Sequence, residues 1–132
     1  MLLPATVAKA RRRDGSGRAN AGQLRIVGGR HRGRKLPVPL QAGLRPTSDR
    51  TRETLFNWLA PVIQGSRCLD CFAGSGALAL EALSRGAGQV VMIERAAAVA
   101  RQLRNNLALL RVPADAAEVV EGDALRWLAE AP

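Results

Sequence analysis

Tyrosine is absent from this sequence, and histidine, cysteine and the other aromatic residues are scarce. The 132 residues include one His and two Cys, and 3% are aromatic, whereas 47% are hydrophobic. The core must therefore be aliphatic, and the length suffices for one domain with a buried core. No apolar run approaches the ~20 residues that span a bilayer, and the N-terminal apolar stretch is too short for a signal peptide. We expect no membrane partner, while the Arg-rich front leaves a transit peptide open as an alternative.

The two cysteines, Cys68 and Cys71, have the C-x-x-C spacing of a redox motif or of half a zinc site. Structural zinc needs about four ligands, and His31 is the sole further nitrogen or sulfur candidate, so no metal site is expected. On a strand, residues three apart point to opposite faces, which predicts two reduced residues that pack in the core. Reduced cysteines imply a cytoplasmic protein.

Acidic residues are nearly absent from the N-terminal part of the chain. Residues 1–52 hold 13 Lys or Arg and 2 acids, a balance of +11, whereas residues 53–132 hold 7 Arg and 9 acids, a balance of −2. A basic charge confined to one part of a protein is suited to a polyanion, and nucleic acid is the leading candidate. The alternative is a solvated charged tail.

The chain divides into a basic arm and one domain. Residues 1–22 mix Arg, Ala, Gly and Ser without periodicity, which predicts a disordered arm, and residues 23–132 form the domain. A basic hairpin is expected over 24–39, with a strand at 24–27, a turn at Gly28-Gly29 and a return strand at 34–36 ended by Pro37 and Pro39.

Beyond the hairpin, the pattern predicts a helix followed by alternating strands and helices. Thr47 or Ser48 can cap that first helix, Asp49 suits its N-terminus, and Pro61 is expected to end it. The later strands are expected at 68–72, 90–93 and 118–120, and the later helices at 77–84, 96–110 and 124–129. Short apolar strands that alternate with helices predict an α/β fold with a parallel sheet.

Three carboxylates follow the three strands of this predicted sheet: Asp70, Glu94 and Asp123. Ligands of open α/β sheets bind beyond the carboxyl ends of the strands, and Gly74 and Gly76 let the backbone approach a ligand closely. Asp70 can bind an ammonium group, Glu94 can accept both hydroxyls of a ribose, and Asp123 can accept from an adenine amino group. A ligand with a cationic end and an adenosine end, such as S-adenosylmethionine, fits this arrangement.

A dinucleotide site is the rival interpretation. Residues 74–79 also match G-x-G-x-x-A, and Glu94 stands near the spacing of a dinucleotide fingerprint. Asp70 separates the two, because its charge would lie beside a pyrophosphate in a dinucleotide complex. For Glu94 and Asp123, a strand-end acid or a helix cap is the structural alternative.

Residues 45–59 read RPTSDRTRETLFNWL and residues 69–78 read LDCFAGSGAL; the hairpin contains RIVGG at 25–29 and RGRKL at 32–36. From residue 24 onward, these stretches resemble the bacterial small-subunit (16S) ribosomal RNA guanine-N2 methyltransferases. The resemblance implies the N-terminal part of a Rossmann-like class I S-adenosylmethionine-dependent methyltransferase, with the basic hairpin in front. It implies ribosomal RNA or a small-subunit assembly particle as partner, and methylation of a guanine N2 amine.

The resemblance also assigns residues to the cofactor. Residues 70–76 would hold the methionine end, Glu94 the ribose, and Asp123 with Ala124 the adenine, while Thr47 would lie beside the methionine. The implied cofactor-binding set is Thr47, Asp70, Phe72, Ala73, Gly74, Ser75, Gly76, Glu94, Asp123 and Ala124. The implied RNA-binding set, chosen by charge and resemblance, is Arg25, Arg30, Arg32, Arg34, Lys35, Arg50 and Arg52.

The sequence departs from this family in one respect. Members continue into further strands and carry a catalytic (D/N)PP(F/Y) segment, which these 132 residues lack. We therefore expect a truncated methyltransferase with no catalytic residue in this chain and with its first sheet strand at an exposed edge. Two other function classes stay open: a non-catalytic RNA-binding module and a nicotinamide-dependent oxidoreductase.

Overall fold

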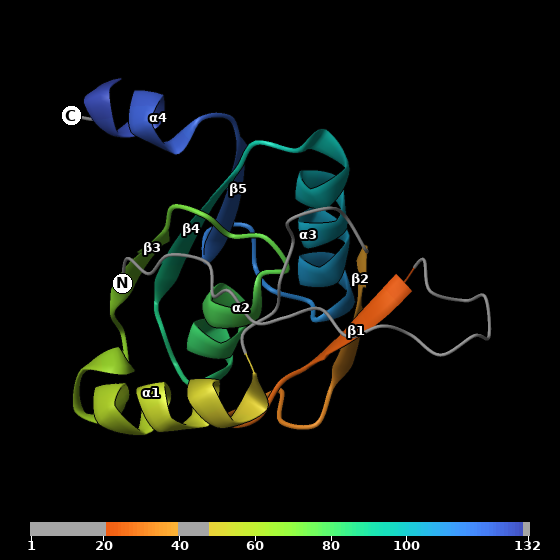
Figure 1. The fold of residues 1–132 in the computed structure, drawn as a ribbon. Coiled ribbons are helices and arrows are strands. Elements are labelled where there is room, and N and C mark those ends of the chain that lie inside the picture. The colour runs from red at the N-terminus through yellow and green to blue at the C-terminus, as the bar shows by residue number, and fades with distance from the viewer. Residues whose placement is uncertain (1–20, 40–47, 131–132) are drawn as a thin grey trace.

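The computed structural model describes residues 21–39 and 48–130, so Thr47 and the expected N-terminal arm up to residue 20 lie outside the described residues. Within them the fold is α/β, with a hairpin followed by alternating helices and strands (Figure 1). The elements are β1 Ala21–Arg25, β2 Lys35–Pro39, α1 Asp49–Ile63, β3 Arg67–Asp70, α2 Ala77–Ser84, β4 Gln89–Glu94, α3 Ala97–Leu109, β5 Ala117–Glu121 and α4 Ala124–Glu130.

The central sheet has three parallel strands in the order β3-β4-β5. Cys68 pairs with Val90, and Met92 pairs with Val119. Each connection between these strands contains a helix, as predicted from the alternation. In the described part of the chain β3 forms one edge of the sheet, which confirms the expected edge position of this strand.

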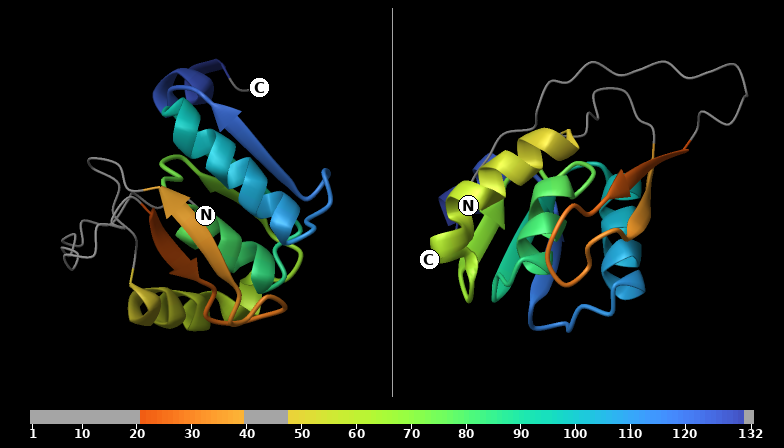
Figure 2. Two further views of the ribbon diagram at one scale, coloured as in Figure 1. Left: turned by 90° about the vertical axis from the view of Figure 1, so that its right-hand side faces the viewer. Right: turned by 90° about the horizontal axis from the view of Figure 1, so that it is seen from below.

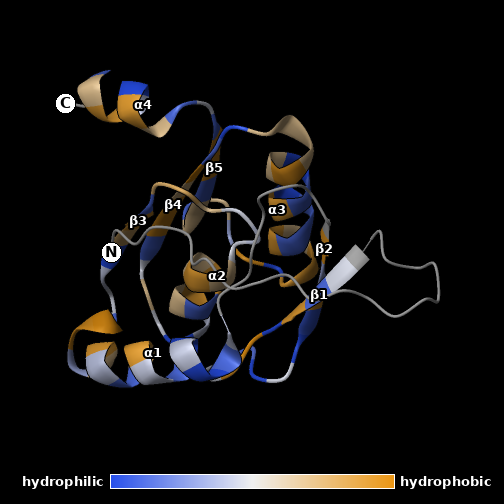
Figure 3. Cartoon of the chain, viewed as in Figure 1, coloured by the Kyte–Doolittle hydropathy of each residue, from blue (hydrophilic) through white to orange (hydrophobic). Residues whose placement is uncertain are grey.

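The face of the sheet that carries Val90 and Met92 forms the main core. Both side chains belong to one buried cluster with Leu80 of α2 and Leu103 of α3. The predicted apolar stripe of α3, formed by Val99, Leu103, Leu107 and Leu110, is buried. In Figure 3 hydrophobic and hydrophilic bands accordingly alternate along α3. Helical periodicity thus correctly placed this helix on the core.

The opposite face of the sheet carries a smaller cluster. Cys71, Ile93 and Ala124 are buried there, with Trp127 of α4 packed against them. Cys68 belongs to the main core, and both cysteines are free and buried. The prediction of two reduced packing residues on opposite faces is confirmed.

The hairpin packs on the helices and does not join the parallel sheet (Figure 2). Leu24, Ile26, Leu36 and Val38 point into the main core, each contributing about 1.5–3 kcal/mol by burial. The side-chain amide of Asn106 on α3 donates to the Pro37 carbonyl at 2.9 Å. These contacts hold one face of the hairpin against the domain and leave the other to solvent.

The structure corrects several expected boundaries. β1 spans Ala21–Arg25, so it begins inside the expected arm and ends before Val27. β2 continues through Pro37, whose backbone carbonyl faces Asn106 and points away from β1. The N–H that proline lacks would therefore not have bonded to β1, and the strand pairing has no gap. β3 ends at Asp70, two residues before Phe72.

Helix α1 does not end at Pro61 but continues to Ile63. Pro61 lacks the N–H that would bond to the Asn57 carbonyl, yet both residues are exposed, so water can satisfy that carbonyl. Ile63 is buried and anchors the last turn in the core. At the other end Ser48 is the cap: its hydroxyl accepts from the Thr51 amide at 3.1 Å.

None of the helices in the described ranges is both long and apolar enough to cross a membrane.

Candidate cofactor-binding site and basic loop

The carboxyl ends of the three parallel strands bring the predicted acids to one edge of the sheet. Asp70 ends β3, Glu94 ends β4, and Asp123 follows β5 by two residues. The amide of Gly122 donates to the Glu94 carbonyl at 2.9 Å, and the amide of Ala73 donates to the Ile93 carbonyl at 3.1 Å. These bonds connect the loops that follow the three strands, so the acids share a single edge.

The glycine turn between β3 and α2 is closely packed. Gly76 precedes α2 with a φ of 84°, and its amide donates to the Ala73 carbonyl at 2.7 Å. A Cβ at Gly76 would lie 2.6 Å from Cδ2 of Leu103. Glycine is therefore required at this position both by the left-handed backbone and by the contact with α3.

Gly76→Ala is expected to lower the free energy of unfolding by about 1–3 kcal/mol for overpacking, in addition to about 1 kcal/mol for the backbone. Gly65→Ala is the matched control, because Gly65 has a φ of 74° and, among the described residues, no atom lies within 4 Å of the position that an added Cβ would take. Urea denaturation of both variants measures the difference. Equal losses would show that the contact with Leu103 relaxes without cost.

Asp70 is the least accessible of the three acids, at 2% exposure. Its Oδ1 accepts from the Phe72 amide at 3.2 Å, whereas its Oδ2 has no hydrogen-bond partner among the described residues. Burial raises the pKa of Asp70 to about 6, and the nearby Glu94 charge acts in the same direction. A buried carboxylate oxygen without a partner is costly, and a cationic ligand would relieve that cost.

Glu94 connects the glycine turn to the end of β4. Its Oε1 accepts from the Gly74 amide at 2.9 Å, and its Oε2 accepts from the Ala96 amide at 3.0 Å. Each carboxylate oxygen has a second lone pair, so both can still accept from a ligand. The structure thus gives Glu94 a role in shaping the turn that the sequence did not indicate.

Asp123 acts as the cap of α4. Its Oδ1 accepts from the amides of Leu125 and Arg126 at 2.8 and 3.2 Å. The helix-cap alternative is therefore present in the structure, and the exposed carboxylate also lies at the sheet edge that carries Asp70 and Glu94. The neighbouring Ala124 is buried.

The remaining expected cofactor residues differ in their exposure. Phe72 is 55% exposed, whereas Ala73 and Ser75 are buried. The Ser75 hydroxyl accepts from the Ala77 amide at 3.3 Å, at the start of α2.

Across residues 21–39 and 48–130, the structure contains no group of three or more His, Cys, Asp or Glu suited to a metal ion.

The expected RNA-binding residues lie on a different part of the molecule. We define the basic loop as residues 26–34, which connect β1 to β2 and carry Arg30, Arg32 and Arg34. Figure 1 shows this loop beside α1 at the lower end of the domain, whereas the acids follow the upper ends of the strands. The loop contacts α2 at Glu81 and Ser84, the fifth and eighth residues of this helix, which is about 12 Å long and begins at the glycine turn.

Six of the seven expected RNA-binding residues are exposed: Arg25, Arg30, Arg32, Arg34, Lys35 and Arg50. His31 lies among them half-buried, and its pKa is lowered by burial and by the charges of Arg30 and Arg34. The imidazole is therefore neutral at pH 7 and adds no positive charge to this surface.

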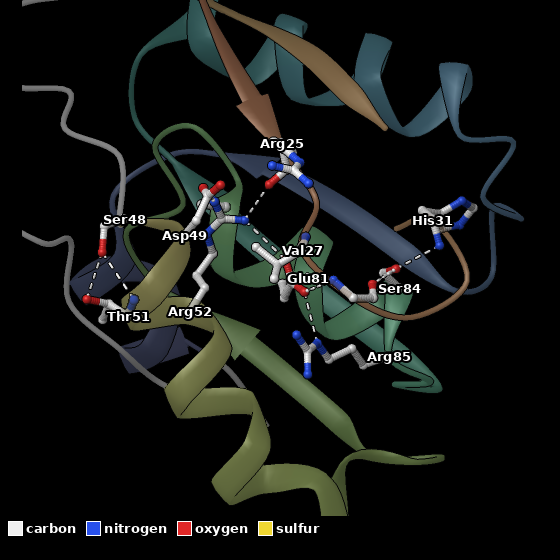
Figure 4. A network of polar contacts seen from close by, with 12 residues as sticks. Arg25, Val27, His31, Ser48, Asp49, Thr51, Arg52, Glu81, Ser84 and Arg85 are labelled. Carbon is white, nitrogen blue, oxygen red and sulfur yellow. Dashed lines mark hydrogen bonds and ion pairs between the residues drawn. The ribbon is translucent and has the colours of Figure 1, made fainter. Parts of the chain in front are cut away.

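The prediction for Arg52 is wrong. Its side chain is 1% exposed and pairs with Glu81 at 3.1 Å and with Asp49 at 2.5 Å, so the guanidinium is not available to a phosphate (Figure 4). Arg52 lies four residues before the buried Phe56 on the core-facing side of α1. That helical spacing was a sequence signal of burial.

Sequence reasoning also missed Glu81 and Ser84 on α2. Glu81 is fully buried and accepts from Arg52 and Arg85, while Ser84 is 4% exposed and bonds to the basic loop. The signal was a charged residue inside a helix that is otherwise apolar from Ala77 to Leu83. A buried charge requires partners, and here they come from three separate elements.

Known proteins resemble this chain in sequence and in fold. Ribosomal RNA small subunit methyltransferase D from Escherichia coli (strain K12) is 61% identical over 112 residues, which cover 85% of this chain and 56% of that protein. The solved structure of "Putative methyltransferase yhhF" from Escherichia coli has 59% identity and a TM-score of 0.74, over 82% of this chain and 57% of that one. The chain thus spans about half the length of these relatives.

A more distant structure, the SAM Dependent Methyltransferase from Agrobacterium tumefaciens, has 17% identity and a TM-score of 0.64 over 87% of this chain and 36% of that one. At this identity the likeness shows the fold alone, which is Rossmann-like as expected. A family model described as "Conserved hypothetical protein 95" matches residues 24–132. The resemblance that the sequence indicated is confirmed, and the chain belongs to this family.

Proposed function

We propose that this chain forms the cofactor-binding part of an S-adenosylmethionine-dependent methyltransferase that acts on a guanine N2 amine of small-subunit ribosomal RNA. The observation that carries the proposal is the buried Oδ2 of Asp70 beside the glycine turn, which has no hydrogen-bond partner within residues 21–39 and 48–130. A carboxylate in that position suits the ammonium of a methionine moiety. The name of the Escherichia coli relative, a ribosomal RNA small subunit methyltransferase, supports the reaction and the substrate.

In this proposal each acid at the sheet edge binds one part of the cofactor. Asp70 accepts from the ammonium, and Glu94 accepts from the ribose hydroxyls while it keeps its bonds to Gly74 and Ala96. Asp123 accepts from the adenine amino group, and the Ala124 amide donates to a ring nitrogen. Residues 72–76 line the methionine end, with Thr47 beside it.

When bound, the cofactor would supply the methyl group as a sulfonium. The residues of this chain would hold and orient it, which is a large part of catalysis when two reactants must be aligned. The amine must also lose a proton, and we assign no residue of this chain to accept it. The chain contains no Pro-Pro, so the catalytic (D/N)PP(F/Y) segment that the resemblance implies is not among these 132 residues.

The exposed basic residues of the hairpin, together with Arg50, are proposed to contact RNA phosphates. Such contacts release counterions, so the affinity should fall steeply as the salt concentration rises. Arg52 is not part of this surface, because its guanidinium is buried.

Calorimetric titration with S-adenosylhomocysteine tests the cofactor assignment. Asp70→Asn should weaken binding roughly 10–100-fold, because it removes one charge-assisted hydrogen bond of about 1.5–3 kcal/mol. Wild-type affinity should also fall below pH 6, where Asp70, with a pKa of about 6, becomes protonated and neutral. Asp115→Asn is the matched control, because Asp115 is exposed in the loop before β5.

Other outcomes would favour the alternatives. A folded wild type that binds RNA but not S-adenosylhomocysteine would favour a non-catalytic RNA-binding module. Binding of NADH that Asp70→Asn leaves intact or strengthens would favour an oxidoreductase, since the substitution removes a negative charge that would lie beside the pyrophosphate.

A further inference from the structure

The basic loop is attached through its backbone to the C-terminal half of α2. Glu81 accepts from the Val27 amide through Oε1 at 3.0 Å and from the Gly28 amide through Oε2 at 2.8 Å. Ser84 donates its hydroxyl to the Gly28 carbonyl at 2.6 Å. Its hydroxyl also accepts from the His31 amide at 2.8 Å (Figure 4). Two side chains of α2 therefore fix the segment that leads into the arginines.

Glu81 is itself held by two arginines from different elements. Arg52 Nη1 lies 3.1 Å from its Oε1, and Arg85 Nε lies 2.9 Å from its Oε2. The same Arg52 nitrogen donates to the Arg25 carbonyl at 2.7 Å, at the end of β1. The carboxylate thus joins α1, α2 and the hairpin at one buried point.

The loop approaches α2 so closely that an added side chain does not fit at Gly29. A Cβ at Gly29, whose φ is +81°, would lie 2.1 Å from the Ser84 carbonyl oxygen, which accepts from the Arg30 amide at 2.7 Å. Gly33, at the far side of the same loop, has a φ of +82°, and no atom that the structure describes lies within 4 Å of such a Cβ. The loop backbone therefore packs tightly against α2 at residues 27–31 but not at Gly33.

We propose that Glu81 and Ser84 are positioning residues for RNA binding, which seat the basic loop on α2 and so fix Arg30 and Arg32 relative to the glycine turn. The apolar side chains of β1 and β2 anchor the strands, but the backbone of residues 27–31 is held by these polar bonds. The inference rests on the proposed contact between this loop and RNA.

Gly29→Ala tests the positioning role without changing any charge. Gly33→Ala is its control, because both positions have a positive φ of similar size. Binding of a fluorescently labelled small-subunit ribosomal RNA transcript is measured by anisotropy against salt. Gly29→Ala should weaken binding about tenfold and lower the salt slope by about 2, as expected for two lost phosphate contacts. Gly33→Ala should stay within about twofold, and the affinity for S-adenosylhomocysteine should change in neither variant.

Ser84→Ala is a milder second variant, which removes the hydroxyl but leaves Glu81 and its arginines in place. Both variants are repeated in a background that carries Arg30→Gln and Arg32→Gln. A positioning residue acts through these arginines, so Gly29→Ala and Ser84→Ala should have almost no further effect on RNA affinity there. A purely structural role would give the same loss in both backgrounds and would overturn the inference.

The two proposals can fail separately. If Arg30→Gln with Arg32→Gln leaves the RNA affinity and its salt slope unchanged, the basic loop does not contact RNA, and the proposed surface is wrong. If that double variant weakens binding but Gly29→Ala and Ser84→Ala do not, the loop contacts RNA, and its attachment to α2 is not required for RNA binding. In that case the positioning inference alone is overturned.

Discussion

Glu81→Gln is expected to lower the free energy of unfolding by about 3–5 kcal/mol, the usual cost of leaving a buried charge without its partner. The amide keeps the shape of the side chain but removes the charge that compensates Arg52 and Arg85. It also offers one acceptor where the carboxylate serves two backbone amides and two guanidiniums. Urea denaturation followed by circular dichroism measures the loss.

Glu118→Gln is the matched control for this prediction, because it removes the same charge from an exposed position on β5. Its effect should stay within about 0.5 kcal/mol. A double-mutant cycle that adds Arg52→Met should show a coupling energy of about 1–3 kcal/mol between the two sites. A loss below about 1 kcal/mol for Glu81→Gln, or no coupling, would show that water reaches this carboxylate.

Asp70→Asn is expected to have the opposite effect on stability, with a gain of up to about 3 kcal/mol at pH 7. The pKa of Asp70 rises from 3.8 to about 6 on folding, mainly through burial, so its carboxylate destabilises the folded state at neutral pH. Asparagine keeps an acceptor for the Phe72 amide without the charge. The same variant should bind the cofactor more weakly.

The sign of the pH dependence follows from the direction of that shift. Between pH 3.8 and pH 6 the folded protein retains a proton on Asp70 that the unfolded chain has released. The wild type therefore gains stability from this group as the pH falls from 6 to 4, and the advantage of Asp70→Asn should disappear over that range. Denaturation curves at pH 7, 6, 5 and 4 measure it, and a constant difference would contradict the assignment.

In the proposed function, Asp70 favours cofactor binding at the expense of stability. Saturating S-adenosylhomocysteine should stabilise the wild type more than Asp70→Asn, because a ligand stabilises the state that binds it. The difference in midpoint between the two proteins should accordingly narrow or reverse when the ligand is present.

Much of the site could be predicted because it depends on local sequence and on the topology of a parallel sheet. Asp70 and Glu94 were expected at one edge because parallel strands end together, and the structure places them there. Asp123 was expected there too, but its bonds to Leu125 and Arg126 identify it as a helix cap as well. An acid between a strand and a helix is expected both for a ligand-binding residue and for a helix cap, so the sequence could not separate these two interpretations.

The errors concern residues whose environment is formed by distant segments. Arg52 was placed on the basic surface by its charge and by resemblance, but its partner Glu81 lies 29 residues away on another helix. Pro37 and Pro61 were expected to end their elements, yet the Pro37 carbonyl faces away from β1, and the Asn57 carbonyl that Pro61 leaves without an N–H is exposed to water. Each outcome depends on which groups face a residue after folding.

The sequence by itself determined the elements of this protein, the aliphatic core and the order of acids and glycines along one sheet edge. These features follow from periodicity, turn chemistry and strand order, which act over short distances along the chain. Only the tertiary structure decided that Glu81 joins α1, α2 and the hairpin, and that one Asp70 oxygen has no hydrogen-bond partner in the described part of the chain. Burial and pairing of charge depend on segments that meet only in the folded state, because a charge in a dry interior must find its partners there.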